Sequence, residues 1–284
     1  MGTINHQELD SKSKWKSFYE TFIKVRIYNL ALMGILLGLF LLIKYVCFII
    51  FKGPLNFGVD LLFWIISGIL FGPIHGPLFS ILCDFVMTTF TSGIAFWMIE
   101  YAIIPPLVSL VSYFYLKLYR EKSKWTIVIS ISTIIIMLLA SVVIFWFQLM
   151  KDNFKYEGIK KIASWAAYLL ISFLVVSITS FLVYCMWMYH KKSEWKYIEW
   201  LYYLSLIILI IVIFRWVWGP YAYIAYAHRF FSKNIDFSKQ YPLTLFGIVT
   251  KSCLTIPIAT IIMVPLLNII KKTKNNDLRF NKYY

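Results

Sequence analysis

Long runs of apolar residues alternate with short polar and lysine-rich segments along most of the chain. A helix that crosses a bilayer needs about 20 mostly apolar residues. Eight segments approach this length and composition: 27–51, 54–72, 74–92, 95–116, 125–149, 162–189, 197–218 and 243–270. The pattern therefore predicts an all-α polytopic membrane protein with about eight transmembrane helices. The second and third of these helices are short, and the joint between them, 72–77, is rich in glycine and proline.

Composition strengthens the membrane interpretation. Hydrophobic residues make up 61% of the chain and charged residues 14%, whereas a soluble domain has about 45–50% apolar and 25% charged residues. On a soluble protein the net charge of +15 would indicate nucleic acid. Here the basic residues flank the apolar runs, so we expect a lipid bilayer as the partner and no nucleic acid.

The distribution of Lys and Arg predicts the orientation in the membrane. With the N-terminus inside, 17 Lys and Arg residues fall on the inner side and 8 on the outer side. Because inner loops carry the excess of basic residues, both termini are expected in the cytoplasm of a multi-pass plasma-membrane protein. The segment 151–161 carries four lysines on the predicted outer side. Residues 12–26 alternate lysine with aromatic residues, as in a segment lying on an anionic inner leaflet.

Ionisable residues inside a membrane are costly and therefore mark candidate functional positions. Six lie within or at the edge of the predicted spans: Lys44, Asp60, Asp84, Glu100, Arg215 and Lys251. All six fall in the predicted outer half, as expected of a polar cavity open to the outside. The alternative is a set of structural ion pairs, for example Asp84 with Lys251. Lys251 lies about 12 Å from the outer end of its helix, too deep to reach the surface easily, so it needs a carboxylate from the protein or from a ligand.

Aromatic residues lie at the same predicted level of the membrane: Phe57, Trp97, Tyr101, Trp216, Trp218, Tyr221 and Tyr223. Trp and Tyr are enriched at membrane interfaces in general. The functional alternative is stacking on a flat heterocycle in a mostly apolar pocket.

Known catalytic patterns are absent from the sequence. It has no glycine-rich phosphate loop, no His-Glu-x-x-His and no nucleophile elbow. The four histidines are scattered, and each of the four cysteines stands alone in an apolar run. We therefore expect no enzyme activity, no metal site and no cofactor.

Residues 57–85 carry the most distinctive local pattern. An apolar helix ends in Phe71-Gly72-Pro73, with Gly76 three residues on and Asp84 eight residues later. An aromatic-rich entry at Phe96 and Trp97 follows. This pattern resembles the S components, the substrate-binding subunits of energy-coupling factor (ECF) vitamin transporters. Gly34 and Gly38 fall where S components carry a small-xxx-small motif, the face that docks on the coupling subunit.

Two further segments resemble the folate group of S components. Residues 214–220, Phe-Arg-Trp-Val-Trp-Gly-Pro, look like the outer end of its fifth helix, and Lys251 before Pro257-Ile258 looks like its last helix. On this basis the expected substrate is a vitamin, first folate. The expected substrate-binding residues are Asp60, Trp97, Glu100, Arg215, Trp218 and Lys251, with Asp84 and Lys44 as structural or pocket polar groups.

S components typically have six helices, so the resemblance divides the chain into five parts. They are a basic N-terminus (1–26), helices one to four (27–119), an inserted transmembrane hairpin (120–196), the last two helices (197–272) and a basic cytoplasmic tail (273–284).

The resemblance implies an importer whose energy comes from other subunits. The chain would capture its vitamin outside and dock through Gly34 and Gly38 on a membrane coupling subunit that carries two ATPases. One alternative is a self-contained transporter with Asp60, Asp84 or Glu100 as proton carriers, although no clean inverted repeat is visible. Another is an S component for pantothenate or riboflavin. A membrane enzyme or assembly protein has no reactive constellation in its favour.

Overall fold

The computed structural model describes residues 27–50, 58–120, 122–150, 164–231 and 237–280. Of these residues 93% are helical and none lies in a strand, so the all-α prediction is confirmed. The predictions made for residues 1–26, for the segment 151–161 and for the last four residues of the tail lie outside the described part of the chain.

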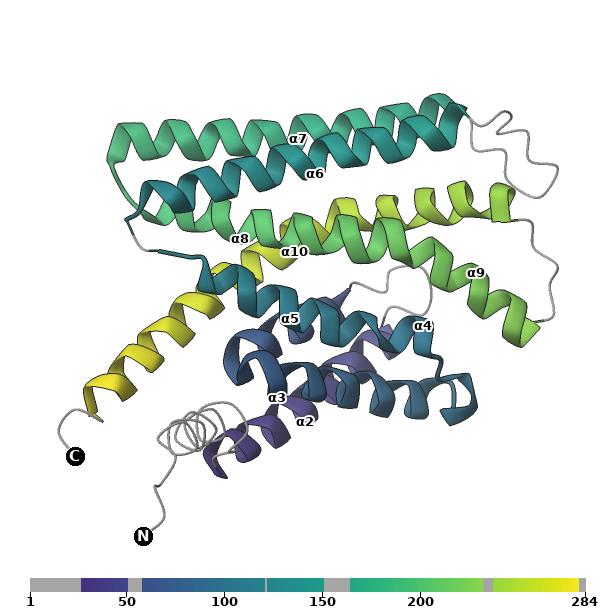
Figure 1. The fold of residues 1–284 in the computed structure, drawn as a ribbon, viewed down its shortest axis with the longest axis horizontal. Coiled ribbons are helices and arrows are strands. Elements are labelled where there is room, and N and C mark those ends of the chain that lie inside the picture. The colour runs from purple at the N-terminus through teal and green to yellow at the C-terminus, as the bar shows by residue number, and fades with distance from the viewer. Residues whose placement is uncertain (1–26, 51–57, 121, 151–163, 232–236, 281–284) are drawn as a thin grey trace, which may run out of the picture. The chain divides into compact units, whose positions relative to one another are not determined.

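Figure 1 shows the helices in chain order. They are α2 (Ile27–Ile50), α3 (Val59–Thr91), the 3-10 helix η2 (Ile94–Phe96), α4 (Ile99–Ala102), α5 (Ile104–Lys117), α6 (Lys124–Met150), α7 (Ser164–Lys192), α8 (Lys196–Ile210), the π-helix η3 (Ile211–Val217), α9 (Trp218–Phe231) and α10 (Phe237–Phe280). Within the described residues, seven helical segments are long and apolar enough to cross a membrane. The chain is therefore a membrane-embedded helical protein.

The helices form two compact units. The N-terminal unit contains α2 to α5, and the C-terminal unit contains α6 to α10 together with Gly58 and Val59.

In the N-terminal unit, α3 is a helical hairpin. Gly72 leaves the helical conformation at φ 81° and ψ −167°, a region that glycine enters without a steric penalty. The Oγ atoms of Ser67 and Ser80 are 2.6 Å apart although 13 residues separate them, whereas a straight helix would hold them about 20 Å apart. The chain thus turns back at Gly72, and the predicted break between 54–72 and 74–92 is confirmed, with the first arm beginning only at Val59.

Small residues allow the two arms and α5 to approach closely. A Cβ atom on Gly76 would lie 2.7 Å from Ser109 Oγ and 2.8 Å from the Ser67 carbonyl oxygen, and one on Gly68 would overlap the Ser109 carbonyl oxygen. The buried Ser67 hydroxyl lies within hydrogen-bonding distance of both Ser80 and Ser109. Glycine and serine therefore hold this three-helix contact, as is usual where helices pack without a hydrophobic driving force.

The fourth predicted helix, 95–116, is interrupted near its start. Gly93, at φ 92°, precedes η2, and the short α4 then leads into α5. Pro105 and Pro106 fall in the first turn of α5, where the missing N–H groups have no helical partner to lose.

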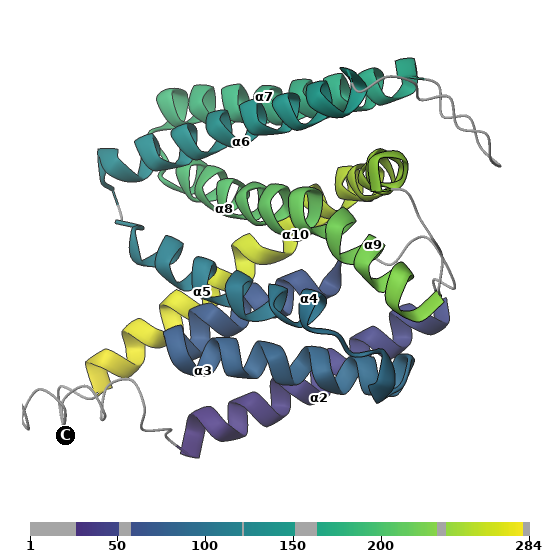
Figure 2. The same ribbon diagram turned by 45° about the vertical axis from the view of Figure 1, so that its right-hand side comes forward.

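In the C-terminal unit, α8 forms the core. Most of its residues from Ile198 to Ile210 are buried, as expected of a helix that is apolar on all sides. Helices α6, α7 and α10 all contact α8. Figures 1 and 2 show α6 and α7 lying side by side as an antiparallel pair.

The predicted end of the seventh helix at residue 218 is wrong. The helix runs on through η3 and α9 to Phe231, and α10 begins at Phe237 rather than 243, so most of the predicted loop 219–242 is helical. Pro220 lacks the N–H that an α-helix would offer to the Trp216 carbonyl. The segment directly before this proline, η3, is a π-helix. The Tyr241 hydroxyl from α10 donates to the carbonyls of Trp216 (3.4 Å) and Val217 (3.1 Å).

Candidate functional site

An ion pair joins α2 to the first arm of α3. Lys44 Nζ lies 2.5 Å from Asp60 Oδ1, and only 7% and 24% of these side chains are exposed. Either charge alone would cost about 2.5–3.5 kcal/mol to place in the membrane. Each residue therefore supplies the partner that the other requires.

A second carboxylate lies near this pair. Asp84, on the second arm of α3, lies near the Trp97 side chain and within electrostatic range of both Lys44 and Asp60. The Trp97 ring meets the Phe85 ring edge-on, with centroids 5.8 Å apart. We call Lys44, Asp60, Asp84 and Trp97 the polar cluster. It contains one cationic group and two carboxyl groups, so the acidic groups outnumber the basic one.

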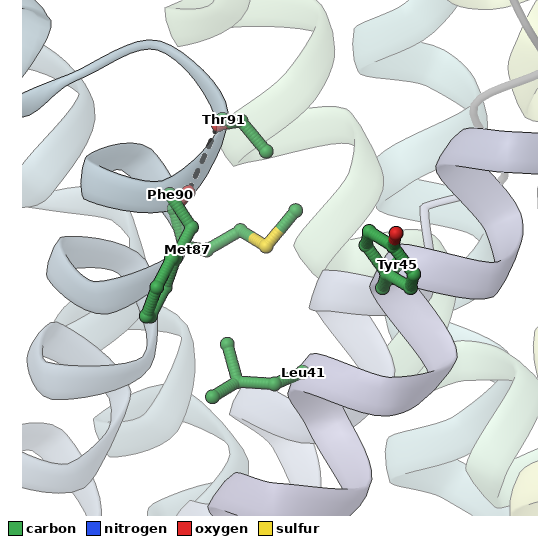
Figure 3. A pocket seen from close by; sticks show the side chains of 5 residues that line it. All are labelled: Leu41, Tyr45, Met87, Phe90 and Thr91. Carbon is green, nitrogen blue, oxygen red and sulfur yellow. Dashed lines mark hydrogen bonds between the residues drawn. The ribbon is translucent and has the colours of Figure 1, made fainter.

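A cavity of about 330 Å³ lies between α2 and the second arm of α3. Figure 3 shows its five lining side chains, from Leu41 and Tyr45 on one side and Met87, Phe90 and Thr91 on the other. The Thr91 hydroxyl donates to the Met87 carbonyl at 2.9 Å, so the walls are mostly apolar. This volume lies at the lower end of the range for small-molecule sites.

Helical register places the polar cluster close to this cavity. Lys44 comes three residues after Leu41 on α2, and Asp84 comes three residues before Met87 on α3, each about 4.5 Å along its helix axis. Asp84, Met87 and Thr91 follow the i, i+3, i+7 spacing of one helix face. The cavity and the polar cluster are therefore neighbours along both helices.

Trp64 adds an unmet polar group to the same region. It lies one helical turn after Asp60, and its indole N–H is buried without a hydrogen-bond acceptor among the described residues. A buried donor without an acceptor costs about 1–3 kcal/mol, so a water or ligand acceptor would be favourable here.

Three of the six predicted substrate-binding residues lie in the N-terminal unit. Asp60 and Trp97 come together in the polar cluster, with Lys44 and Asp84 beside them. Glu100 is partly exposed in the first turn of α4.

The other three predicted residues lie in the C-terminal unit, each on a different helical element. The Arg215 guanidinium, on η3, lies against Gly58. Trp218 begins α9, and its ring packs edge-on against Tyr221 at 5.4 Å. Lys251 is exposed on α10 and has no ion-pair partner among the described residues.

Contacts between η3 and α10 involve residues that the sequence did not single out as polar partners. The Trp216 indole donates to Ser252 Oγ at 3.0 Å, and the Trp216 ring packs on Phe145 of α6. Ser252 therefore faces η3, while Lys251, one residue earlier, lies on an exposed face of α10.

Gly34 and Gly38, the predicted docking positions, are both exposed on α2. A Cβ atom built on either would meet no other atom of the described residues within 4 Å. Within the described part of the N-terminal unit, nothing therefore covers this face of α2, which leaves it accessible to another helix.

Sequence reasoning missed the residues that line the cavity. The helical spacing of Met87 and Thr91 from Asp84 is the signal that could have found these two. It also missed the serine contacts within α3, because serine in an apolar run has no distinctive pattern.

No group of three or more His, Cys, Asp or Glu residues in the described part of the chain could hold a metal ion. Comparisons with protein-family models, with curated proteins and with solved structures find no match to this chain, so its function rests on the residues and geometry above.

Proposed function

We propose that this protein is the substrate-binding subunit of an ECF-type importer in the plasma membrane, with a vitamin, first of all folate, as its substrate. The observation that carries the proposal is the polar cluster beside an apolar cavity within a membrane-embedded unit. Polar groups at such depth are costly, and the commonest reason for their presence is a site for a ligand or an ion.

The chemistry of the cavity suits a flat ring with N–H donors. Phe90 and Tyr45 offer aromatic surfaces, and Met87 offers a polarisable thioether. Asp84 offers a carboxylate in a region with more carboxyl groups than cations. A heterocycle with amino or ring N–H groups would complement this set. Lys251 and Arg215, in the C-terminal unit, stay predictions for binding an anionic group.

Delivery would depend on other subunits. The sequence has no nucleotide-binding motif, so ATP hydrolysis would take place on partner ATPases joined by a membrane coupling subunit. The uncovered Gly34 and Gly38 are the candidate contact with that subunit. The full proposal has eight membrane passes and both termini in the cytoplasm.

Identification of bound small molecules tests the proposal directly. The protein is purified in mild detergent from its own host, and small molecules released by denaturation are identified by mass spectrometry. We expect a vitamin at close to one molecule per chain. A preparation that binds none of folate, pantothenate and riboflavin at micromolar concentration would contradict the proposal.

Two substitutions then locate the site. Asp84→Asn should weaken binding about 10-fold or more, because a charge-assisted hydrogen bond is worth about 1.5–3 kcal/mol. Lys251→Ala should weaken binding of an anionic vitamin. The control is Thr179→Val on the exposed face of α7, which should bind normally. Unchanged affinity in both test variants counts against these positions.

The second candidate is a self-contained, proton-coupled transporter. The carboxyl excess of the polar cluster favours it, because Asp84 could carry a proton. The purified chain alone is reconstituted in vesicles with an imposed proton gradient. Uptake under these conditions would support the second candidate over the ECF proposal, and uptake that requires a coupling module and ATP would support the first.

A further inference from the structure

In the C-terminal unit, a hydrogen-bonded network joins two loops at one end of the helices. The Trp195 indole donates to the Tyr119 hydroxyl at 2.9 Å, and the Tyr119 hydroxyl donates to Glu199 Oε1 at 2.9 Å. The Tyr119 ring also packs edge-on against the buried Tyr202, with centroids 5.1 Å apart. One phenol therefore fixes the segment before α6 against the segment between α7 and α8.

The joined loops carry a dense set of exposed cations. Six basic residues are exposed on these loops and the adjoining helix ends: Lys117, Arg120, Lys122, Lys124, Lys191 and Lys192. We call these six the basic surface. None of them has an ion-pair partner among the described residues.

Nearby carboxylates are already engaged. Glu194 forms an ion pair with Lys196, and the hydrogen bond from Lys196 lowers the pKa of the Glu194 carboxyl. Glu199 accepts from Tyr119. Glu121, the remaining acidic residue in these loops, lies outside the described residues. The basic surface thus has more positive charge than the neighbouring described groups offset.

The basic surface lies at the ends of three apolar helices. Lys124 begins α6, Lys192 ends α7 and Lys196 begins α8, and Figures 1 and 2 show these three helix ends together. Trp125 and Trp187 are 67% and 56% exposed beside them, as is typical of side chains at a membrane interface. The Lys191 ammonium lies 5.0 Å from the centre of the Trp187 ring, so the two side chains lie together at the end of α7.

We propose that the basic surface binds the phosphate groups of anionic lipids at the cytoplasmic face of the membrane. Lys and Arg near such a headgroup layer are attracted to it electrostatically. The Arg120 guanidinium offers the paired N–H donors that match phosphate oxygens. A lipid is favoured over a soluble anion because the cations surround the ends of three apolar helices, where acyl chains can pack along α6 and α7. This inference is independent of the proposed transport function.

Native mass spectrometry of the full chain tests the proposal. The purified protein is titrated with phosphatidylglycerol or with phosphatidylcholine of the same acyl chains. We expect several phosphatidylglycerol molecules to remain bound where phosphatidylcholine does not. Arg120→Gln combined with Lys192→Gln should weaken phosphatidylglycerol binding about 10- to 30-fold, since each cation contributes roughly fivefold. Inorganic phosphate at millimolar concentration should not displace the lipid.

Two further variants test whether lipid binding depends on this particular surface or only on the overall positive charge of the protein. Lys160→Gln combined with Lys161→Gln removes the same charge from the segment that links α6 to α7, and should leave lipid retention unchanged. Tyr119→Phe keeps every charge but removes the link between the loops, so it should weaken selectivity for phosphatidylglycerol. Thermal unfolding of each variant shows whether the fold is kept. Equal retention of the two lipids, equal loss in the two double variants, or displacement by phosphate alone would overturn the proposal.

Discussion

Lys44 and Asp60 illustrate how a single contact makes charged residues tolerable in a membrane. Their charged groups are 2.5 Å apart and mostly buried. Bringing two opposite charges together recovers much of the cost of removing each from water, but a well-packed apolar pair can be equally stable. The pair therefore provides a specific contact between α2 and α3 more than a large net stabilisation.

Substitution of one partner tests how far the two charges compensate each other's cost of burial. Lys44→Met leaves Asp60 without its cation, and we expect the free energy of unfolding to fall by about 2.5–3.5 kcal/mol, the cost of an isolated charge. Lys44→Met combined with Asp60→Leu should recover most of that loss. The measurement is unfolding by sodium dodecyl sulfate in mixed micelles, with the exposed Lys191→Met as the control. A double variant no more stable than Lys44→Met would show that the pairing is not what Lys44 contributes.

The sequence predicted the charged positions at this scale but not their partners. Period and hydropathy located Lys44, Asp60 and Asp84 within apolar runs. Which carboxylate meets Lys44 depends on the rotation of α2 against the arms of α3, and helical periodicity alone does not fix that rotation.

Among the structural elements, the α3 hairpin depends most directly on particular residues. Gly72 supplies the positive φ, Pro73 begins the second arm, and Gly68 and Gly76 let the arms meet α5 without side chains between them. The turn was predictable because glycine and proline act locally. The serine contacts were not, because they depend on how the arms lie against each other.

A pair of glycine substitutions tests this account of the hairpin. Gly68→Ala would drive a Cβ atom into the Ser109 carbonyl oxygen, and we expect a loss of about 1–3 kcal/mol from overpacking. Gly34→Ala meets open space on α2 and should be neutral or stabilise the isolated chain by up to about 1 kcal/mol. The same unfolding titration compares the two variants. Similar effects at both positions would contradict the close contact at Gly68.

At the predicted end of the seventh helix, local signals gave the wrong boundary. Gly219 and Pro220 normally indicate a helix end. Tyr241, 21 residues further along the chain, donates to the Trp216 carbonyl, which Pro220 leaves without its helical N–H partner, and also to the Val217 carbonyl. A contact from another helix thus overrides the local preference, and sequence reasoning has no access to it.

For the whole molecule, the hairpin determines whether the two termini lie on the same side of the membrane. A straight α3 would count as one pass and would give seven passes with the candidate spans. A hairpin returns the chain to the side from which it came, whether its arms cross fully or only enter the bilayer. Six further crossings, one for each remaining candidate span, would bring the chain end back to the side of its start.

We expect both termini in the cytoplasm, because the basic end of the α6–α7 pair is also expected on the inner side. Reporter fusions that are active on only one side of the membrane can be placed at each terminus in turn and on the segment between α6 and α7. We expect cytoplasmic signals from both termini and an external signal from that segment.

The matched control replaces Gly72 by Ala, which disfavours the turn at φ 81°. This variant should lower the yield of folded protein without reversing the N-terminal signal. Termini on opposite sides would mean that α3 crosses once in the membrane, and would remove both the hairpin and the eight-pass arrangement.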